Sequence, residues 1–259
     1  MCTLIVLHRC LPEAPLVVAA NRDEFLDRPA EGPKLRETPH GPVVSPRDAR
    51  AGGTWLGVNG SGVFAALTNR RCENPDPQRR SRGLLVMDAL TASSAADAAK
   101  RMRVLARGAY NPFNLLVADP NQAYLVTYDE SPNQLALDPG VHVVGNVEPG
   151  TATPKIDRLQ EAAEKAVLGG PDTLVDRLAE ICRGHDGGGD PLRDTCVHAG
   201  SYGTRSSTLL WLGREAGESV LRFSEGPPCE NEYEDFTPLL RRLERSGASE
   251  GANATREAS

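Results

Sequence analysis

The sequence predicts an α+β domain in which antiparallel sheets and helices occupy separate stretches of the chain. Pairs of short apolar runs are joined by turns rich in Gly, Asp, Asn or Pro, which is the pattern of β-hairpins. Segments with helical periodicity lie between these pairs. The order of strands, helices, strands, helices and strands favours antiparallel sheets over repeated βαβ units. The 259 residues are sufficient for one domain with a sizeable core.

Four pairs of apolar runs are the predicted strands, and residues 141–145 add a further apolar run. Residues 29–50 are instead rich in Pro, Gly and charge, so we expect an extended surface loop there. The strand pairs lie at residues 3–7 and 16–20, 54–59 and 63–69, 114–118 and 123–128, and 207–212 and 219–223.

Four segments show helical periodicity: residues 84–90, 95–106, 155–167 and 174–181. Ser94 is a suitable N-cap for the second of them. Residues 244–259 contain no large apolar side chain, which predicts a disordered tail. The sequence therefore predicts a single domain over residues 1–243.

Composition excludes several classes of function. The chain has 35 acidic and 29 basic residues, for a formal net charge of −6, so the basic patch of a nucleic-acid-binding protein is not expected. No apolar run approaches the roughly 18 residues that a spanning helix needs. No secretory signal is recognisable, so we expect a cytoplasmic protein whose six cysteines do not form a disulfide scaffold.

Cys2 lies directly behind the initiator Met, and this position offers a catalytic device. Removal of Met1 leaves a thiol and a free α-amine on the same residue. The reference pKa is about 7.7–8.0 for the amine and about 8.5 for the thiol, so the amine can take the thiol proton near neutral pH without a histidine. The alternative is that Cys2 is an ordinary residue of the N-terminal strand.

Polar residues at the end of the second strand favour the catalytic interpretation. Period-two alternation places Asn21 and Asp23 on one face of this strand, with Arg22 and Glu24 on the other. Because this strand is expected beside the first, the Asp23 carboxylate would lie near the charged amine.

Three further residues could serve a reaction at Cys2. Asn69 ends a predicted strand and Asn146 follows the apolar run at 141–145, so each could present a side-chain amide to a developing oxyanion. Arg205 precedes the last hairpin and could lower the thiol pKa or anchor an anionic substrate. The alternative for each of these three residues is that its side chain only completes the hydrogen bonds of a turn.

These residues fall in six motifs that resemble the NRDE family, also called the TANGO2 (transport and Golgi organisation 2) family. The motifs are the Cys2 start, Asn21-Arg22-Asp23-Glu24, Gly52-Gly53-Thr54-Trp55-Leu56-Gly57-Val58, Leu67-Thr68-Asn69-Arg70, Asn111-Pro112-Phe113-Asn114-Leu115-Leu116 and Tyr202-Gly203-Thr204-Arg205-Ser206-Ser207-Thr208. That family resembles the N-terminal-nucleophile (Ntn) hydrolases of the penicillin V acylase and bile-salt hydrolase group. The resemblance implies a four-layer αββα sandwich and hydrolysis of a C–N amide or acyl bond in a small-molecule substrate.

The resemblance also implies a role for each matched residue. Cys2 would be nucleophile and base, Asp23 would orient the amine, Asn69 and Asn146 would form the oxyanion hole, and Arg205 would be the late arginine of the site. Asn21, Arg22 and Trp55 are candidate substrate-binding residues. No metal or cofactor is implied.

Three positions depart from the pattern of these relatives. The early arginine of the acylases falls at Ala20, and the usual Ser-Asn-Ser stretch is Gly145-Asn146-Val147. Thr153 stands where a Trp commonly precedes Pro-Lys. The substrate pocket near Asn146 is therefore expected to differ from theirs.

Two other classes of function remain open to the sequence. Because the eukaryotic branch of the family is linked to haem trafficking and to lipid or acyl-CoA homeostasis, the fold could carry such a ligand without turning it over, although no Cys-x-x-Cys-His motif is present. A zinc-stabilised module could use Cys182-x-x-His185 and Cys196-x-His198. The second spacing is tighter than the usual two to four intervening residues, which disfavours the module.

Overall fold

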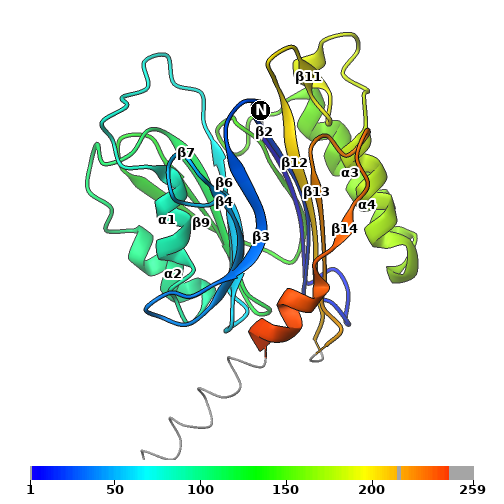
Figure 1. Cartoon of the computed structure of the whole chain (residues 1–259), viewed down its shortest axis with the longest axis horizontal. Helices are drawn as coiled ribbons and strands as arrows, with labels where there is room; N and C mark the ends of the chain where they lie inside the picture. Colours follow the sequence, from blue (N-terminus) through cyan, green and yellow to red (C-terminus); the bar gives the residue numbers. More distant parts are fainter. Residues whose placement is uncertain (1, 215–216, 245–259) are drawn as a thin grey trace, which may run out of the picture.

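The computed structural model describes residues 2–214 and 217–244, which form two antiparallel sheets packed face to face (Figure 1). Helices cover the outer surface of each sheet, so the order of layers is helix, sheet, sheet, helix. The predicted α+β class, with two stacked antiparallel sheets between helices, is confirmed.

The first sheet brings together strands that are far apart in the sequence. Its members are β1 (Thr3–His8), β2 (Leu16–Phe25), β10 (Gly140–Val144), β11 (His198–Ala199), β12 (Tyr202–Leu212), β13 (Val220–Glu225) and β14 (Glu234–Asp235). Their order is β10-β1-β2-β12-β13-β14, with β11 paired to β12. Thr3 lies opposite Asn21, and Asp23 lies opposite Thr204. The start of β1, the end of β2 and the start of β12 therefore meet at one end of this sheet.

The second sheet is a meander in which each strand pairs with the next in sequence. Its members are β3 (Ala30–Arg36), β4 (Val43–Asp48), β5 (Leu56–Asn59), β6 (Phe64–Asn69), β7 (Phe113–Ala118), β8 (Ala123–Tyr128) and β9 (Pro132–Leu137). The predicted hairpins at 54–69 and 114–128 correspond to β5 with β6 and β7 with β8.

Alternation along the strands supplies three apolar layers. In β2, Val18 contributes to the core between the sheets, whereas Val17 and Ala19 face α3 (Pro154–Leu168) and α4 (Leu174–Arg183). The outer face of the second sheet packs against α1 (Arg82–Ala89) and α2 (Ala95–Met102). The predicted cap is confirmed, since the Ser94 side chain accepts a hydrogen bond from the Asp97 backbone N–H at 3.1 Å.

The prediction of an extended loop at residues 29–50 is wrong, because this stretch contains β3 and β4. β3 is an edge strand, where proline and charge are tolerated. Pro33 falls at a register shift between Glu31 and Lys34. Pro46 lies beyond Val44, where the pairing of β4 with β5 ends. The composition of a loop is thus compatible with strands at the margin of a sheet.

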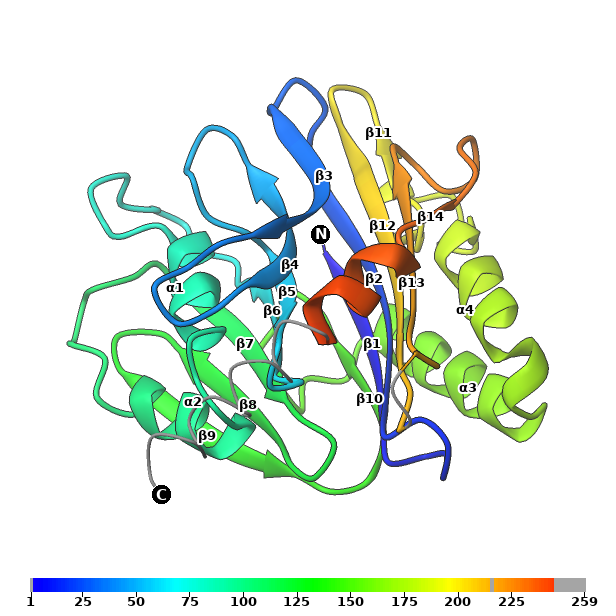
Figure 2. The same ribbon diagram turned by 60° about the horizontal axis from the view of Figure 1, so that its bottom comes forward.

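Near the C-terminus, residues 237–244 are helical and cover one end of the space between the sheets (Figure 2). Leu240 and Leu243 are buried there in the core between the two sheets. The disordered tail predicted at 244–259 lies outside the described residues, except for Glu244. No helix within the described ranges is both long and apolar enough to cross a membrane.

Candidate active site

Cys2 lies immediately before β1, at the end of the first sheet where β2 and β12 also meet. Its Sγ donates a hydrogen bond to the backbone carbonyl of Asp23 at 3.6 Å. Burial raises the pKa of the Cys2 thiol, and the charge of Asp23 raises it further, while Arg22 acts in the opposite direction. In this setting the thiol needs a base to become a nucleophile.

The Asp23 carboxyl group is buried and held by the neighbouring strand. Thr204 donates its hydroxyl hydrogen to Asp23 Oδ1 at 2.7 Å, and the Tyr202 hydroxyl donates to the Asp23 carbonyl at 3.2 Å. Burial raises the pKa of Asp23, although Lys155 and the Thr204 hydrogen bond oppose the shift. The pairing of β2 with β12 therefore fixes both the side chain and the backbone of Asp23 beside Cys2.

A cavity of about 260 Å³ opens at Cys2. Its walls are mainly apolar and come from β10, the segment after it and the start of α3. The lining comprises Cys2, Thr3, Val143, Gly145, Asn146, Val147, Thr153, Pro154, Lys155, Ile156, Leu159 and Arg193. The cavity is large enough for an acyl group and carries two basic residues at its border.

Asn146 links this cavity to a second hollow of about 490 Å³, which is lined by Asn69, Arg70, Arg71, Asn146, Leu192, Ala199 and Tyr202. Its Nδ2 donates to the backbone carbonyl of Asn69, and its buried Oδ1 has no hydrogen-bond partner among the described residues. The Asn69 residue is exposed in the same hollow. The two predicted oxyanion-hole residues are therefore neighbours, and Asn146 shares the cavity with Cys2.

The predicted alternation at the end of β2 separates two environments. Asn21 points toward α4, where its Nδ2 donates to the carbonyls of Cys182 and Thr195 at 2.8 and 2.9 Å. Arg22 points toward the other sheet, and its guanidinium lies 4.3 Å from the centre of the Trp55 ring. These contacts anchor the end of β2 on both sides; substrate binding by Asn21, Arg22 and Trp55 stays a prediction.

Arg205 lies in a β-bulge, where the register of β2 with β12 shifts between Thr204 and Ser206. Its guanidinium is 3.9 Å from Glu225, and it borders a small cavity together with Trp55. These contacts of Arg205 are on the Trp55 side of β12, and its role toward Cys2 stays a prediction.

Two basic residues that the sequence did not single out lie within electrostatic range of Cys2. Lys155 is the second residue of α3; it donates to the Asp194 carbonyl at 2.7 Å and interacts with both Asp23 and Cys2. Arg82 begins α1 and donates to the Pro112 carbonyl at 2.9 Å. Burial lowers the pKa of each. No sequence motif marked Arg82. It lies in α1, which packs on the second sheet, so its approach to Cys2 depends on how the two sheets are stacked.

Comparison with known proteins establishes the family. The chain matches the family described as Transport and Golgi organisation 2 over residues 1–225. It belongs to the TANGO2 family. It is 30% identical over 227 residues to the Transport and Golgi organization 2 homolog of Mus musculus, covering 75% of this chain and 81% of that protein. The Homo sapiens homolog is also 30% identical, over 226 residues with the same coverage.

Comparison with solved structures shows which known folds this TANGO2 chain resembles. The N-acylethanolamine-hydrolyzing acid amidase ortholog of Caenorhabditis elegans aligns with a TM-score of 0.55 and 12% identity, covering 80% of this chain and 92% of that one. Penicillin V acylase from Agrobacterium tumefaciens aligns with a TM-score of 0.56 and 13% identity, covering 92% and 87%. The expected Ntn-hydrolase fold is therefore confirmed.

Proposed function

We propose that this protein, after removal of Met1, is an Ntn amidohydrolase that uses Cys2 on a small N-acyl amide or related acyl substrate. The observation that carries the proposal is the position of Cys2, whose Sγ lies 3.6 Å from the Asp23 carbonyl at the opening of an apolar cavity. The amidase and the acylase of the same fold supply the reaction class by analogy.

The first half of the reaction is acylation. The α-amine of Cys2 takes the thiol proton, and Sγ attacks the carbonyl carbon of the amide. The carbonyl oxygen then carries the negative charge, and we assign its stabilisation to the side-chain amides of Asn69 and Asn146. In support, Asn146 lines the cavity at Cys2 and borders a second hollow together with Asn69. Collapse of this intermediate breaks the C–N bond, and the ammonium returns its proton to the departing amine. The product is a thioester on Cys2.

The second half is hydrolysis of the thioester. The α-amine takes a proton from water as the water oxygen bonds to the acyl carbon. The C–S bond then breaks, the acid leaves, and the ammonium returns its proton to the Cys2 thiolate. Asp23 assists both halves because its buried carboxylate stabilises the protonated amine. Lys155 and Arg193 border the same cavity, so a substrate with an anionic group is favoured over a cationic one.

The test compares two forms of the chain that differ only at the amine. Intact mass first establishes whether Met1 has been removed. A matched variant carries one glycine inserted before Cys2, which keeps the thiol but converts the amine into an amide. N-acyl aminocoumarin amides with short to long acyl chains, penicillin V and N-acylethanolamines serve as probes.

We expect the processed chain to release acid and the glycine-blocked variant to lose about 10²–10⁴-fold in rate, the usual contribution of a general base. Cys2→Ala should abolish turnover, and rapid acid quench should trap an acyl group on Cys2 of the wild type. Retention of Met1 in the native protein, or equal rates for both forms, contradicts the mechanism. If no probe is turned over, and hemin or acyl-CoA binds saturably and equally well to the wild type and to Cys2→Ala, the protein is instead a ligand carrier.

A further inference from the structure

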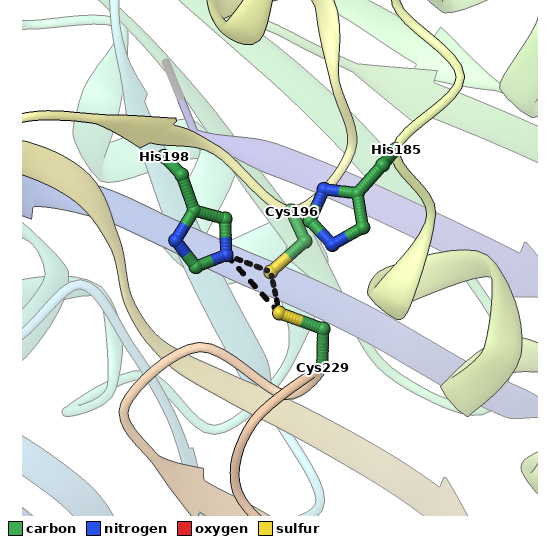
Figure 3. A group of neighbouring side chains, drawn as sticks. All are labelled: His185, Cys196, His198 and Cys229. Atoms are coloured by element: carbon green, nitrogen blue, oxygen red, sulfur yellow. Dashed lines mark hydrogen bonds between the residues drawn. The ribbon is translucent and has the colours of Figure 1, made fainter.

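Four side chains with metal-binding atoms meet beside β11, and none of them lines the cavity at Cys2. They are His185, Cys196, His198 and Cys229, and one ligand atom from each lies within 4.8 Å of the others (Figure 3). His185 follows α4, Cys196 and His198 lie at β11, and Cys229 comes from the segment after β13. The cluster therefore joins three separate stretches of chain.

The distances among three of the four ligand atoms fit one tetrahedral ion. The two sulfurs are 3.4 Å apart, and His198 Nε2 lies 3.8 Å from Cys196 Sγ and 3.1 Å from Cys229 Sγ. Zn–S bonds of about 2.3 Å and Zn–N bonds of about 2.0–2.1 Å place tetrahedral ligands about 3.5–3.8 Å apart. The three separations among Cys196, Cys229 and His198 lie within about half an ångström of this range, and the His185 nitrogen lies within 4.8 Å of the other three ligand atoms. Two thiolates and two imidazoles are the typical donor set of structural zinc.

Carboxylates stand behind both imidazoles. His198 Nδ1, the ring nitrogen that faces away from the sulfurs, is 3.9 Å from Glu230 Oε1. His185 Nδ1 is 3.9 Å from Asp194 Oδ2, and Asp194 is itself fixed because its Oδ1 accepts from Gly187 N–H at 2.7 Å. A carboxylate that orients the second nitrogen of a ligating histidine is a recurrent feature of zinc sites. Hydrophobic packing gives no reason for this arrangement.

We propose that His185, Cys196, His198 and Cys229 bind one Zn²⁺ as a closed structural site. Binding to zinc requires both cysteines as thiolates, so the two thiol protons are released to solvent. Cys196 is buried, whereas His185 and His198 are exposed, which leaves a path for the ion to enter. The ion ties the segments around residues 185 and 229 to β11.

This site would stabilise the strand that holds Asp23. Between Cys196 and His198, Val197 donates its N–H to Thr204 Oγ1 at 2.8 Å and accepts from Thr204 N–H at 2.8 Å. Thr204 in turn donates to Asp23. Zinc would therefore act on the candidate active site by positioning Thr204, and it would not take part in the reaction.

The ligand set differs from the module considered from sequence spacing. Cys182 is not part of the cluster, because its buried thiol interacts with Ser207 and Tyr233. Cys229 completes the set from 31 residues beyond His198. The one-residue spacing of Cys196 and His198 is no obstacle, since alternate residues of extended chain can turn their side chains to the same side.

The experiment measures metal in full-length protein purified without a polyhistidine tag, by elemental mass spectrometry. We expect about one zinc per chain in the wild type and in Cys72→Ser, which removes an exposed cysteine outside the cluster. Cys229→Ala should lose the metal, and Cys229→His should retain it because an imidazole replaces the thiolate. Metal-free protein that takes up no Zn²⁺ when titrated with the ion overturns the proposal.

Two further readouts distinguish a zinc site from adventitious metal and from a disulfide. Glu230→Gln should weaken zinc binding about 10–100-fold in a chelator competition, while Glu232→Gln, a neighbouring exposed carboxylate paired with Arg183, should not. A disulfide between Cys196 and Cys229 is the rival outcome. Free thiols are counted in protein denatured without reductant, and a disulfide would lower the count by two. A disulfide found in freshly prepared protein overturns the proposal.

Discussion

Thr204 is the residue whose replacement most directly tests how the candidate site is held together. Its hydroxyl donates to the buried Asp23 carboxylate at 2.7 Å and accepts from Val197 N–H at 2.8 Å. Thr204→Val keeps the shape of the side chain and removes both interactions. A hydrogen bond to a charged group is worth about 1.5–3 kcal/mol, and a buried N–H left unsatisfied costs about 1–3 kcal/mol.

These terms together predict a loss of about 2.5–6 kcal/mol in the free energy of unfolding. For a domain of this size each kcal/mol shifts Tm by about 2–4 °C, so Tm should fall by roughly 5–24 °C. The pKa of Asp23 should also rise further, because the Thr204 hydrogen bond is one of the effects that lower it. The measurement is denaturant unfolding followed by circular dichroism, with Tm from calorimetry.

Thr208→Val is the matched control on the same strand. Thr208 is as deeply buried as Thr204, but its Oγ1 has no hydrogen-bond partner among the described residues. Its replacement should leave stability unchanged or slightly higher. If the two variants unfold at the same denaturant concentration, the Thr204 hydroxyl does not hold Asp23 and the reasoning is refuted.

Two other predictions concern charge and close packing. Burial raises the pKa of Asp23 in the folded protein above its value of about 3.9 in the unfolded chain. The contribution of Asp23 to stability is therefore greatest below about pH 3.9, where Asp23 is protonated, and it is lost as the pH rises through the folded-state pKa. Asp23→Asn in the glycine-blocked chain should therefore unfold at higher denaturant than its parent at pH 7 and at the same denaturant near pH 3; a constant difference at both pH values contradicts this. A Cβ on Gly53 would lie 2.2 Å from the Gly83 carbonyl carbon, so Gly53→Ala should push α1 away from the sheet and lower the free energy of unfolding by about 1–3 kcal/mol. Gly32→Ala, whose Cβ would meet only two ring atoms of Phe223 at 3.5 and 3.8 Å, should change the free energy of unfolding little. Equal midpoints for the two variants would argue against the close approach of Gly53 to Gly83.

The parts of the fold that sequence could predict are those with local causes. The turn between β7 and β8 is set by Asp119, whose Oδ1 accepts from the N–H groups of Asn121 and Gln122. Thr153 caps α3 by accepting from Ile156 N–H. By contrast, β3 and β4 owe their state to pairing with a neighbour, and no local pattern announces an edge strand that contains Pro33.

The candidate site shows the same division. Cys2 and Asp23 could be related from sequence because β1 and β2 form a hairpin, which fixes their register. Lys155 and Thr204 reach Asp23 only through long-range contacts. Both fall in stretches that the family resemblance covers, but no local pattern relates either residue to Asp23. The cluster at Cys229 is the extreme case, since its ligands come from three segments whose meeting depends on the whole first sheet.

The contrast between the two sheets has a consequence for how the chain acquires its function during synthesis. The second sheet forms from one continuous stretch, so most of its pairings close short loops and can form early; the pairing of β6 with β7, across α1 and α2, is the exception. In the first sheet, β2 can pair with β1 early but lacks its second partner until β12 has been made, an interval of roughly 10–35 s at 5–20 residues per second. Throughout that interval Cys2 has no finished cavity around it. We therefore expect an aminopeptidase to reach Met1 on the nascent chain, before β12 completes the surroundings of Asp23.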